Sequence, residues 1–194
     1  MSHSRDEIVA LSAVCDALAQ GDRDHAASLA RSGLPFSLFE RDTEKYNEFQ
    51  SMKIFLRDGF IDRYTGQRLV FPGTLRLLSQ LLPDEFPFHS NWKMTECHYM
   101  YWKYFPTIDH IDPRTRGGGV NDNNLITTSM LRNSAKSNWT LEELAWRIYP
   151  PGNVADWDGL TKWFLSYTER NPIGLANLYL RQWQGAAIRA LTAC

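Results

Sequence analysis

Two short extended segments near the middle of the chain constrain its fold more than any other feature. Residues 107–113 alternate between apolar and polar side chains, as a strand does, and end at a proline. A second strand is indicated at residues 125–128, after a loop rich in glycine and asparagine, and residues 130–136 predict a short helix. Most of the remaining chain has helical periodicity. We therefore expect an α+β protein that is mostly helical, with two strands and a helix at its centre.

The segment before this centre predicts helices and one hairpin. Thr43 is the expected N-cap of a helix that continues to Leu56, because its hydroxyl can accept a bond from a free backbone N–H. Periodicity and turn residues indicate further helices over residues 8–18, 24–31 and 75–82, and a hairpin over residues 60–71 whose turn is residues 64–67.

Helices return after the centre. Thr140 and Glu143 fit a capping box, and the helix that they begin should stop at Pro150. Another helix is expected over residues 160–170. The last helix is expected from residues 171–172, with a proline at the first helical position.

The chain shows no repeat, low-complexity tract or clear linker. We therefore expect a single compact domain of residues 1–194. Its predicted parts are N-terminal helices (1–58), a central core (60–137) and C-terminal helices (139–194).

Composition excludes several classes of protein. Apolar residues make up 43% and charged residues 22%, which are globular values, and no apolar run is long enough to span a bilayer. The first residues lack the pattern of a secretory signal, so a cytoplasmic protein is expected. The three cysteines are an odd number without paired spacing, which argues against a disulfide framework. The net charge of −1 means that any nucleic-acid binding must be local, in the middle of the chain where basic residues are in excess.

Aromatic residues crowd residues 83–106 and can be interpreted in two ways. Next to basic residues they could stack on nucleic-acid bases. The interpretation we favour is a core built around an irregular loop. The tryptophans of the C-terminal part are also expected to be packing residues: Trp146, Trp157, Trp163 and Trp183.

The first strand carries an adjacent acid and base, Asp109 and His110. Because neighbouring strand residues point to opposite faces, they cannot both bind one metal side by side. Asp109 and Asn133 would together offer oxygen ligands of the kind that Mg²⁺ prefers. A neutral imidazole at His110 can accept a proton from water near neutral pH. This arrangement suits metal-assisted hydrolysis of a phosphodiester.

These residues resemble the HNH endonucleases, whose shared core is the ββα-metal (His-Me) finger. The resemblance rests on the Asp109–His110 pair, on Asn124 and Asn133 at matching intervals, and on Lys136 one helical turn further on. It covers about residues 107–137. A weaker similarity lies at residues 64–66, where many relatives have Tyr-Cys-Gly.

The resemblance implies a role for each matching residue. His110 would be the general base, Asp109 and Asn133 the metal ligands, and Asn124 the residue that holds the loop and orients the base. The implied activity is Mg²⁺-dependent cleavage of DNA, with Mn²⁺ as a substitute, leaving a 5′-phosphate and a 3′-hydroxyl. Many relatives also bind zinc through two Cys-x-x-Cys pairs. This chain has none, so we expect no structural zinc and a core closed by packing.

Four basic residues near the motif are candidates for phosphate contacts. The alternative is a solvated face, and we favour the phosphate contacts. These residues are Arg114, Arg116, Arg132 and Lys136.

Other functions stay open at this point. The finger could serve a non-catalytic nucleic-acid-binding protein, or an RNase of the same class. A single finger cuts one strand, so cleavage of a duplex would need a homodimer or two encounters. Bacterial or phage restriction, defence and mobile-element roles all fit, while no membrane partner is expected. Separately, His89, Cys97 and His98 could hold zinc with one more ligand, although a structural role is favoured.

Overall fold

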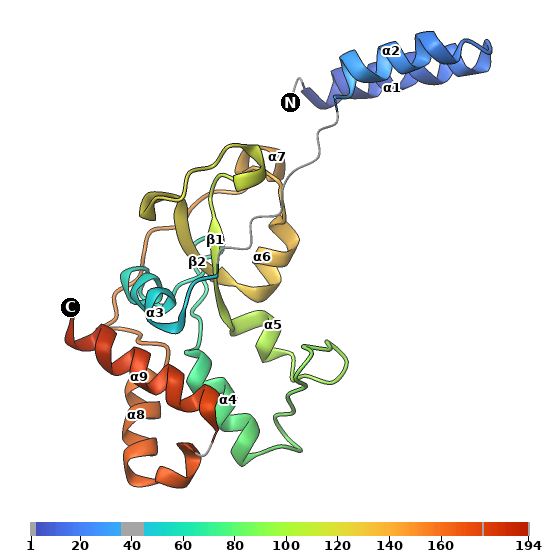
Figure 1. Ribbon diagram of the computed structural model, residues 1–194. Helices are drawn as coiled ribbons and strands as arrows, with labels where there is room; N and C mark the ends of the chain where they lie inside the picture. The colour runs from blue at the N-terminus through green and yellow to red at the C-terminus, as the bar shows by residue number, and fades with distance from the viewer. Residues whose placement is uncertain (1–2, 36–44, 176, 194) are drawn as a thin grey trace. The chain divides into compact units, whose positions relative to one another are not determined.

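The computed structural model describes residues 3–35, 45–175 and 177–193. The chain divides into two compact units, residues 1–41 and residues 42–194 (Figure 1). This division replaces the single compact domain that we expected. Its physical reason is that the first two helices pack on each other, whereas the large aromatic cores are built from residues of the second unit.

The first unit consists of two helices, α1 (His3–Ala19) and α2 (Arg23–Gly33). Gly21 adopts a left-handed conformation at the turn, and the Asp22 carboxylate caps α2 by accepting a bond from the His25 backbone N–H. The two helices confirm the sequence prediction for this segment.

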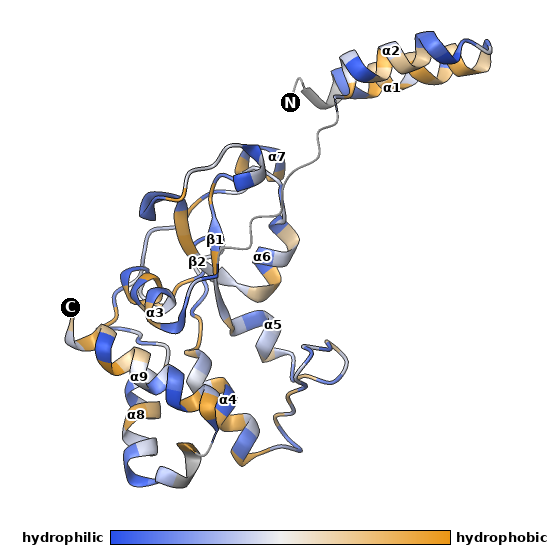
Figure 2. Ribbon diagram, in the orientation of Figure 1, coloured by the Kyte–Doolittle hydropathy of each residue, from blue (hydrophilic) through white to orange (hydrophobic). Residues whose placement is uncertain are grey.

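The main core of the second unit lies between helices that are far apart in the sequence. Helix α9 (Leu178–Thr192) packs against α3 (Glu48–Arg57) and α4 (Pro72–Leu81), and α4 also meets α8 (Thr161–Arg170). Figure 2 shows apolar residues on α4 and α9. Of these, Leu77 on α4 and Leu180 on α9 are fully buried by the packing. The largest core side chains are aromatic: Phe55, Phe60, Phe71, Phe164 and Trp183.

The aromatic segment forms a second core and confirms the packing interpretation. Tyr101, on α5 (Met100–Tyr104), is fully buried, with Phe86 and Phe105 beside it. The tryptophans of the C-terminal part are less uniform than we expected. Trp183 is buried in the main core, whereas Trp163 is 40% exposed on α8.

The two predicted strands pair, and a helix follows them directly. Strand β1 (Pro106–His110) is antiparallel to β2 (Leu125–Ser129), with Pro106 opposite Ser129 and His110 opposite Leu125. The Ser129 hydroxyl then caps α6 (Met130–Lys136). Short 3₁₀ helices, η1 (Arg114–Arg116) and η2 (Asp122–Asn124), lie in the connection between the strands. The expected α+β class with two central strands is confirmed at this level.

Two local predictions for the segment before the sheet need correction. Helix α3 begins after Asn47, which forms a capping box with Gln50, whereas Thr43 lies outside the described residues. The hairpin is reduced to one bridge between Ile61 and Arg68, because the turn between them is held by bonds to Asp62 instead.

The helices near the end of the chain also differ in their limits. Thr140 and Glu143 form the expected capping box, but α7 (Leu141–Leu144) ends at Ala145, whose left-handed conformation stops the helix well before Pro150. The segment that starts at Pro172 is the 3₁₀ helix η3 (Pro172–Leu175), and α9 has its own cap at Asn177. Among the described helices, none has both the length and the apolar character needed to cross a membrane.

Candidate active site

Strand β1 presents an acid and a base on its two faces. The Asp109 side chain is directed towards α6, where the Lys136 Nζ lies 3.2 Å from Asp109 Oδ2. His110, the next residue, lies on the other side beside Tyr46, whose hydroxyl oxygen is 3.4 Å from His110 Nε2. This is the alternation that a strand imposes on neighbouring residues. Asp109 is buried and His110 is half-buried.

One oxygen of Asp109 is held by a hydrogen bond and by an ion pair. The Tyr64 hydroxyl donates to Asp109 Oδ2 at 2.7 Å, next to the Lys136 contact. Burial and the negative charge of Asp109 raise the pKa of Tyr64 far above its ordinary value, so the phenol stays protonated and keeps donating. The other oxygen, Oδ1, accepts no hydrogen bond from any described residue. One lone-pair region of this buried carboxylate is therefore available to a ligand.

Helix α6 sets two polar side chains against β1. Asn133 donates through Nδ2 to the Thr107 hydroxyl and to the Ile108 carbonyl, both at 3.0 Å. One turn later, the Lys136 ammonium donates to the His110 carbonyl at 2.7 Å. Both Asn133 bonds use the amide nitrogen, which leaves its Oδ1 for another partner.

The donor chemistry of Asp109 and Asn133 fits a hard divalent cation. A carboxylate oxygen and an amide oxygen are ligands that Mg²⁺ accepts, and this ion keeps much of its water shell. Within the described part of the chain, no three His, Cys, Asp or Glu side chains gather into a metal-binding group. A site with few protein ligands is thus the kind that these residues could make.

Asn124 joins the two ends of the loop between the strands. Its Oδ1 accepts from the Asp112 backbone N–H at 2.8 Å, and its Nδ2 donates to the carbonyls of Asp112 and Gly119 at 3.1 and 2.7 Å. The Asn124 carbonyl also accepts from the Ile111 N–H. A Cβ at Gly118 would lie 1.9 Å from the Asp112 carbonyl oxygen, so this position requires glycine. The loop that follows His110 is thereby held in one conformation.

The four basic residues near the motif have different surroundings. Arg116 is exposed and pairs with Glu143 at 2.8 Å, and Arg132 is exposed with its guanidinium 5.4 Å from the centre of the Trp146 ring. Arg114 is half-buried in η1. Lys136 is fully buried, and its ammonium is used by Asp109 and the His110 carbonyl. The expected phosphate contact of Lys136 is therefore corrected to an internal contact.

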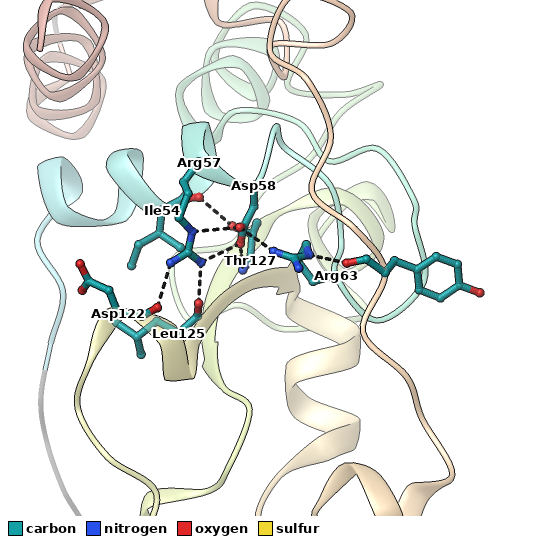
Figure 3. A network of polar contacts seen from close by, with 8 residues as sticks. Ile54, Arg57, Asp58, Arg63, Asp122, Leu125 and Thr127 are labelled. Atoms are coloured by element: carbon teal, nitrogen blue, oxygen red, sulfur yellow. Dashed lines mark hydrogen bonds and ion pairs between the residues drawn. The ribbon is translucent and has the colours of Figure 1, made fainter. Parts of the chain in front are cut away.

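Sequence reasoning did not identify the buried acid Asp58, which organises the far side of β2. Figure 3 shows its carboxylate accepting from Arg57, from Arg63 at 2.8 Å and from the Thr127 backbone N–H at 2.7 Å. Arg57 also donates to the carbonyls of Asp122 and Leu125. Both arginines belong to the basic middle of the chain, and the structure uses them in internal contacts.

Asp62 is a second buried acid that the sequence did not single out. Its Oδ1 accepts from the Tyr64 backbone N–H and from the Thr128 hydroxyl, and its Oδ2 accepts from the Ser129 N–H. Asp62 thus ties the turn that carries Tyr64 to the end of β2. The only sequence signal for Tyr64 was the weak similarity at residues 64–66.

The candidate zinc cluster is occupied by internal contacts. The His89 backbone N–H donates to Cys97 Sγ at 3.3 Å, and the His89 ring pairs with Glu96 at 3.5 Å. The His98 ring stacks on Phe86 with 4.2 Å between centroids. These contacts agree with the structural role that we favoured.

Comparisons with protein-family models, with curated proteins and with solved structures find no match to this chain.

Proposed function

We propose that this protein is a metal-dependent endonuclease of the HNH type that hydrolyses phosphodiester bonds in DNA. The observation that supports it best is the pairing on β1. A buried carboxylate with one available oxygen and a half-buried imidazole occupy adjacent positions on opposite faces of the strand. In this proposal β1, β2 and α6 form the ββα-metal finger.

Each side chain has a defined task in the proposed reaction. Asp109 and Asn133 would hold Mg²⁺, with Mn²⁺ as a substitute, and the bound ion would supply electrostatic stabilisation of charge on the phosphate. His110 accepts the proton of the attacking water as the new oxygen–phosphorus bond forms. The bond from phosphorus to the 3′ oxygen breaks, and that oxygen takes up a proton from solvent. The products are a 5′-phosphate and a 3′-hydroxyl.

The hydrogen bonds around the site support this assignment by keeping the reacting groups in place. Lys136 binds the His110 carbonyl, and Asn124 closes the loop that follows His110. Such fixed positioning lowers the entropy that must be lost in the transition state. Asn124 is therefore proposed as a positioning residue.

Plasmid cleavage tests the proposal. Purified protein is incubated with supercoiled DNA in Mg²⁺, Mn²⁺ or EDTA, beside His110→Ala and the control His25→Ala, which changes an exposed histidine of α2. We expect metal-dependent nicking that falls roughly a hundredfold or more in His110→Ala and is unchanged in His25→Ala. Wild-type rates in His110→Ala would refute the role of His110 as the base.

One observation favours a second function. The Lys136 ammonium already neutralises the Asp109 carboxylate, as it would in a finger that binds nucleic acid without cutting it. In that case DNA is bound but not cleaved in any metal. Parallel digestion of duplex DNA, single-stranded DNA and RNA separates a DNase from an RNase of the same class.

A further inference from the structure

A basic, aromatic pocket lies next to the candidate active site. It has a volume of about 400 Å³, and its walls include Tyr64, Arg132, Trp146, Arg147 and Tyr149. None of the described residues that line it is acidic. The pocket thus combines flat apolar rings with two guanidinium groups, a combination that suits a planar ligand with negative charge.

The rings and cations of the pocket contact one another. The Arg132 guanidinium lies 5.4 Å from the centre of the Trp146 ring, and the Tyr64 and Trp146 rings are 5.4 Å apart. Arg147 lies 4.8 Å from the Tyr149 ring centre and donates to the Tyr149 hydroxyl at 3.0 Å. Each arginine is thereby placed beside an aromatic ring of the wall.

The backbone of the wall is held in place before any ligand arrives. The Tyr149 N–H donates to the Arg63 carbonyl at 2.7 Å, and Arg63 Nε donates back to the Tyr149 carbonyl at 2.6 Å. Ala145 has a positive φ, a strained conformation for a residue with a side chain, and the Trp146 N–H then bonds to the Leu141 carbonyl. A preformed wall lowers the entropic cost of binding.

Two residues connect this pocket to the candidate active site. The ring of Tyr64 lines the pocket, while its hydroxyl donates to Asp109. Arg132 precedes Asn133 on α6, so one helix supplies both the pocket and the proposed metal ligand. The pocket and the candidate active site therefore share the Tyr64 side chain and helix α6.

We propose that this pocket binds one unpaired nucleotide of the DNA strand that is cut, with its base against Trp146 and a neighbouring phosphate near Arg132 and Arg147. The proposal rests on the proposed function. It implies that the substrate is single-stranded or locally unpaired DNA, because the bases of a regular duplex are stacked inside it and cannot enter a pocket.

Binding of a short fluorescent oligothymidylate, measured by anisotropy in EDTA, tests the proposal without cleavage. We expect Trp146→Leu to raise the dissociation constant on the order of tenfold, as is typical for loss of a stacking residue. Arg132→Gln should raise it less and reduce its salt dependence. The control is Trp163→Leu, which changes an exposed tryptophan of α8 and should bind like the wild type.

The outcomes separate the pocket from the catalytic proposal. If Trp146→Leu and Arg132→Gln both bind like the wild type while metal-dependent cleavage is present, the pocket proposal is wrong and the nuclease proposal stands. If both variants lose binding but no DNA is cut in any metal, the pocket proposal stands alone. Trp146→Leu could weaken binding by destabilising the fold, which a lower melting temperature would reveal. Arg132 is exposed, so Arg132→Gln should fold as the wild type does and still tests the pocket.

Discussion

Two buried carboxylates on either side of the small sheet have different partners. Asp58, beside β2, accepts four hydrogen bonds, two on each oxygen, and its side chain is 1% exposed. Asp109, on β1, accepts one hydrogen bond, from Tyr64, and forms one ion pair, with Lys136, both on Oδ2, and its side chain is 10% exposed. Both carboxylate oxygens of Asp58 thus have hydrogen-bond partners within the protein. In Asp109 only Oδ2 has partners among the described residues.

This difference separates a structural acid from a candidate ligand. A buried carboxylate needs hydrogen bonds or opposite charges to offset its lost hydration. Asp58 obtains all of them from within the protein, so no capacity remains for a metal or a substrate. Asp109 keeps one oxygen for a partner that the protein itself does not supply. Substitutions at the two sites test this contrast.

The largest effect on stability is expected from removing Asp58. Asp58→Ala would leave Arg63 and the Thr127 N–H without their carboxylate, and loss of one member of a buried ion pair costs about 3–5 kcal/mol. Urea denaturation should show this decrease in the free energy of unfolding. The matched control is Asp156→Ala, at an exposed position, which should change it by less than about 0.5 kcal/mol. Equal effects of the two variants would contradict the structural role of Asp58.

A smaller effect is expected when Asp109 loses its hydroxyl donor. Tyr64→Phe removes a hydrogen bond to a charged acceptor, which is worth about 1.5–3 kcal/mol. The comparison variant is Tyr101→Phe, because the Tyr101 hydroxyl bonds to neutral groups, the Leu75 carbonyl and the Ser79 hydroxyl, and each such bond is worth about 0.5–1.5 kcal/mol. Thermal denaturation compares the two. A cost of less than about 0.5 kcal/mol for Tyr64→Phe would mean that Asp109 does not depend on this donor.

The available oxygen of Asp109 predicts stabilisation by Mg²⁺. At a concentration ten times the dissociation constant, binding to the folded state alone adds about 1.4 kcal/mol. We expect Mg²⁺ to raise the melting temperature of the wild type and of the exposed-site control Asn138→Ala, and not that of Asn133→Ala. An equal shift in Asn133→Ala would remove this residue from the ligand set.

The smallest change in the free energy of unfolding is expected at Glu143, whose carboxylate is exposed. It provides a surface carboxylate to compare with the two buried ones. Bonds from Thr140, followed by Arg116, lower the pKa of Glu143 below its ordinary value of 4.5. Its stabilisation is therefore present above that value and is lost as the pH falls through the lowered pKa. Glu143→Gln should be less stable than the wild type at pH 7 by no more than about 1 kcal/mol. The free energies of unfolding of the wild type and of Glu143→Gln should become equal as the pH is lowered. A difference between them that does not change with pH would argue against the titration of Glu143.

Short-range sequence patterns predicted the elements that depend on neighbouring residues. The strands β1 and β2, helix α6 and the capping box at Thr140 all follow from alternation, loop composition and cap chemistry. The limits of α3 and α7 were wrong, because a competing cap at Asn47 and a left-handed Ala145 decided them. The spacing of Asp109, His110, Asn124 and Asn133 predicted the residues of the candidate site. Their catalytic roles stay predictions.

The contacts made across the fold could not be read from spacing. Lys136 is one turn beyond Asn133, a position that suggested a surface contact with phosphate, yet packing of α6 on β1 buries it against Asp109. Tyr64 lies 45 residues from Asp109 in the chain, and its hydroxyl becomes the partner of that carboxylate. Local order and residue chemistry follow from neighbours in sequence. The partner and hydration of each buried charge depend on which distant segments meet, because burial is a property of the folded chain.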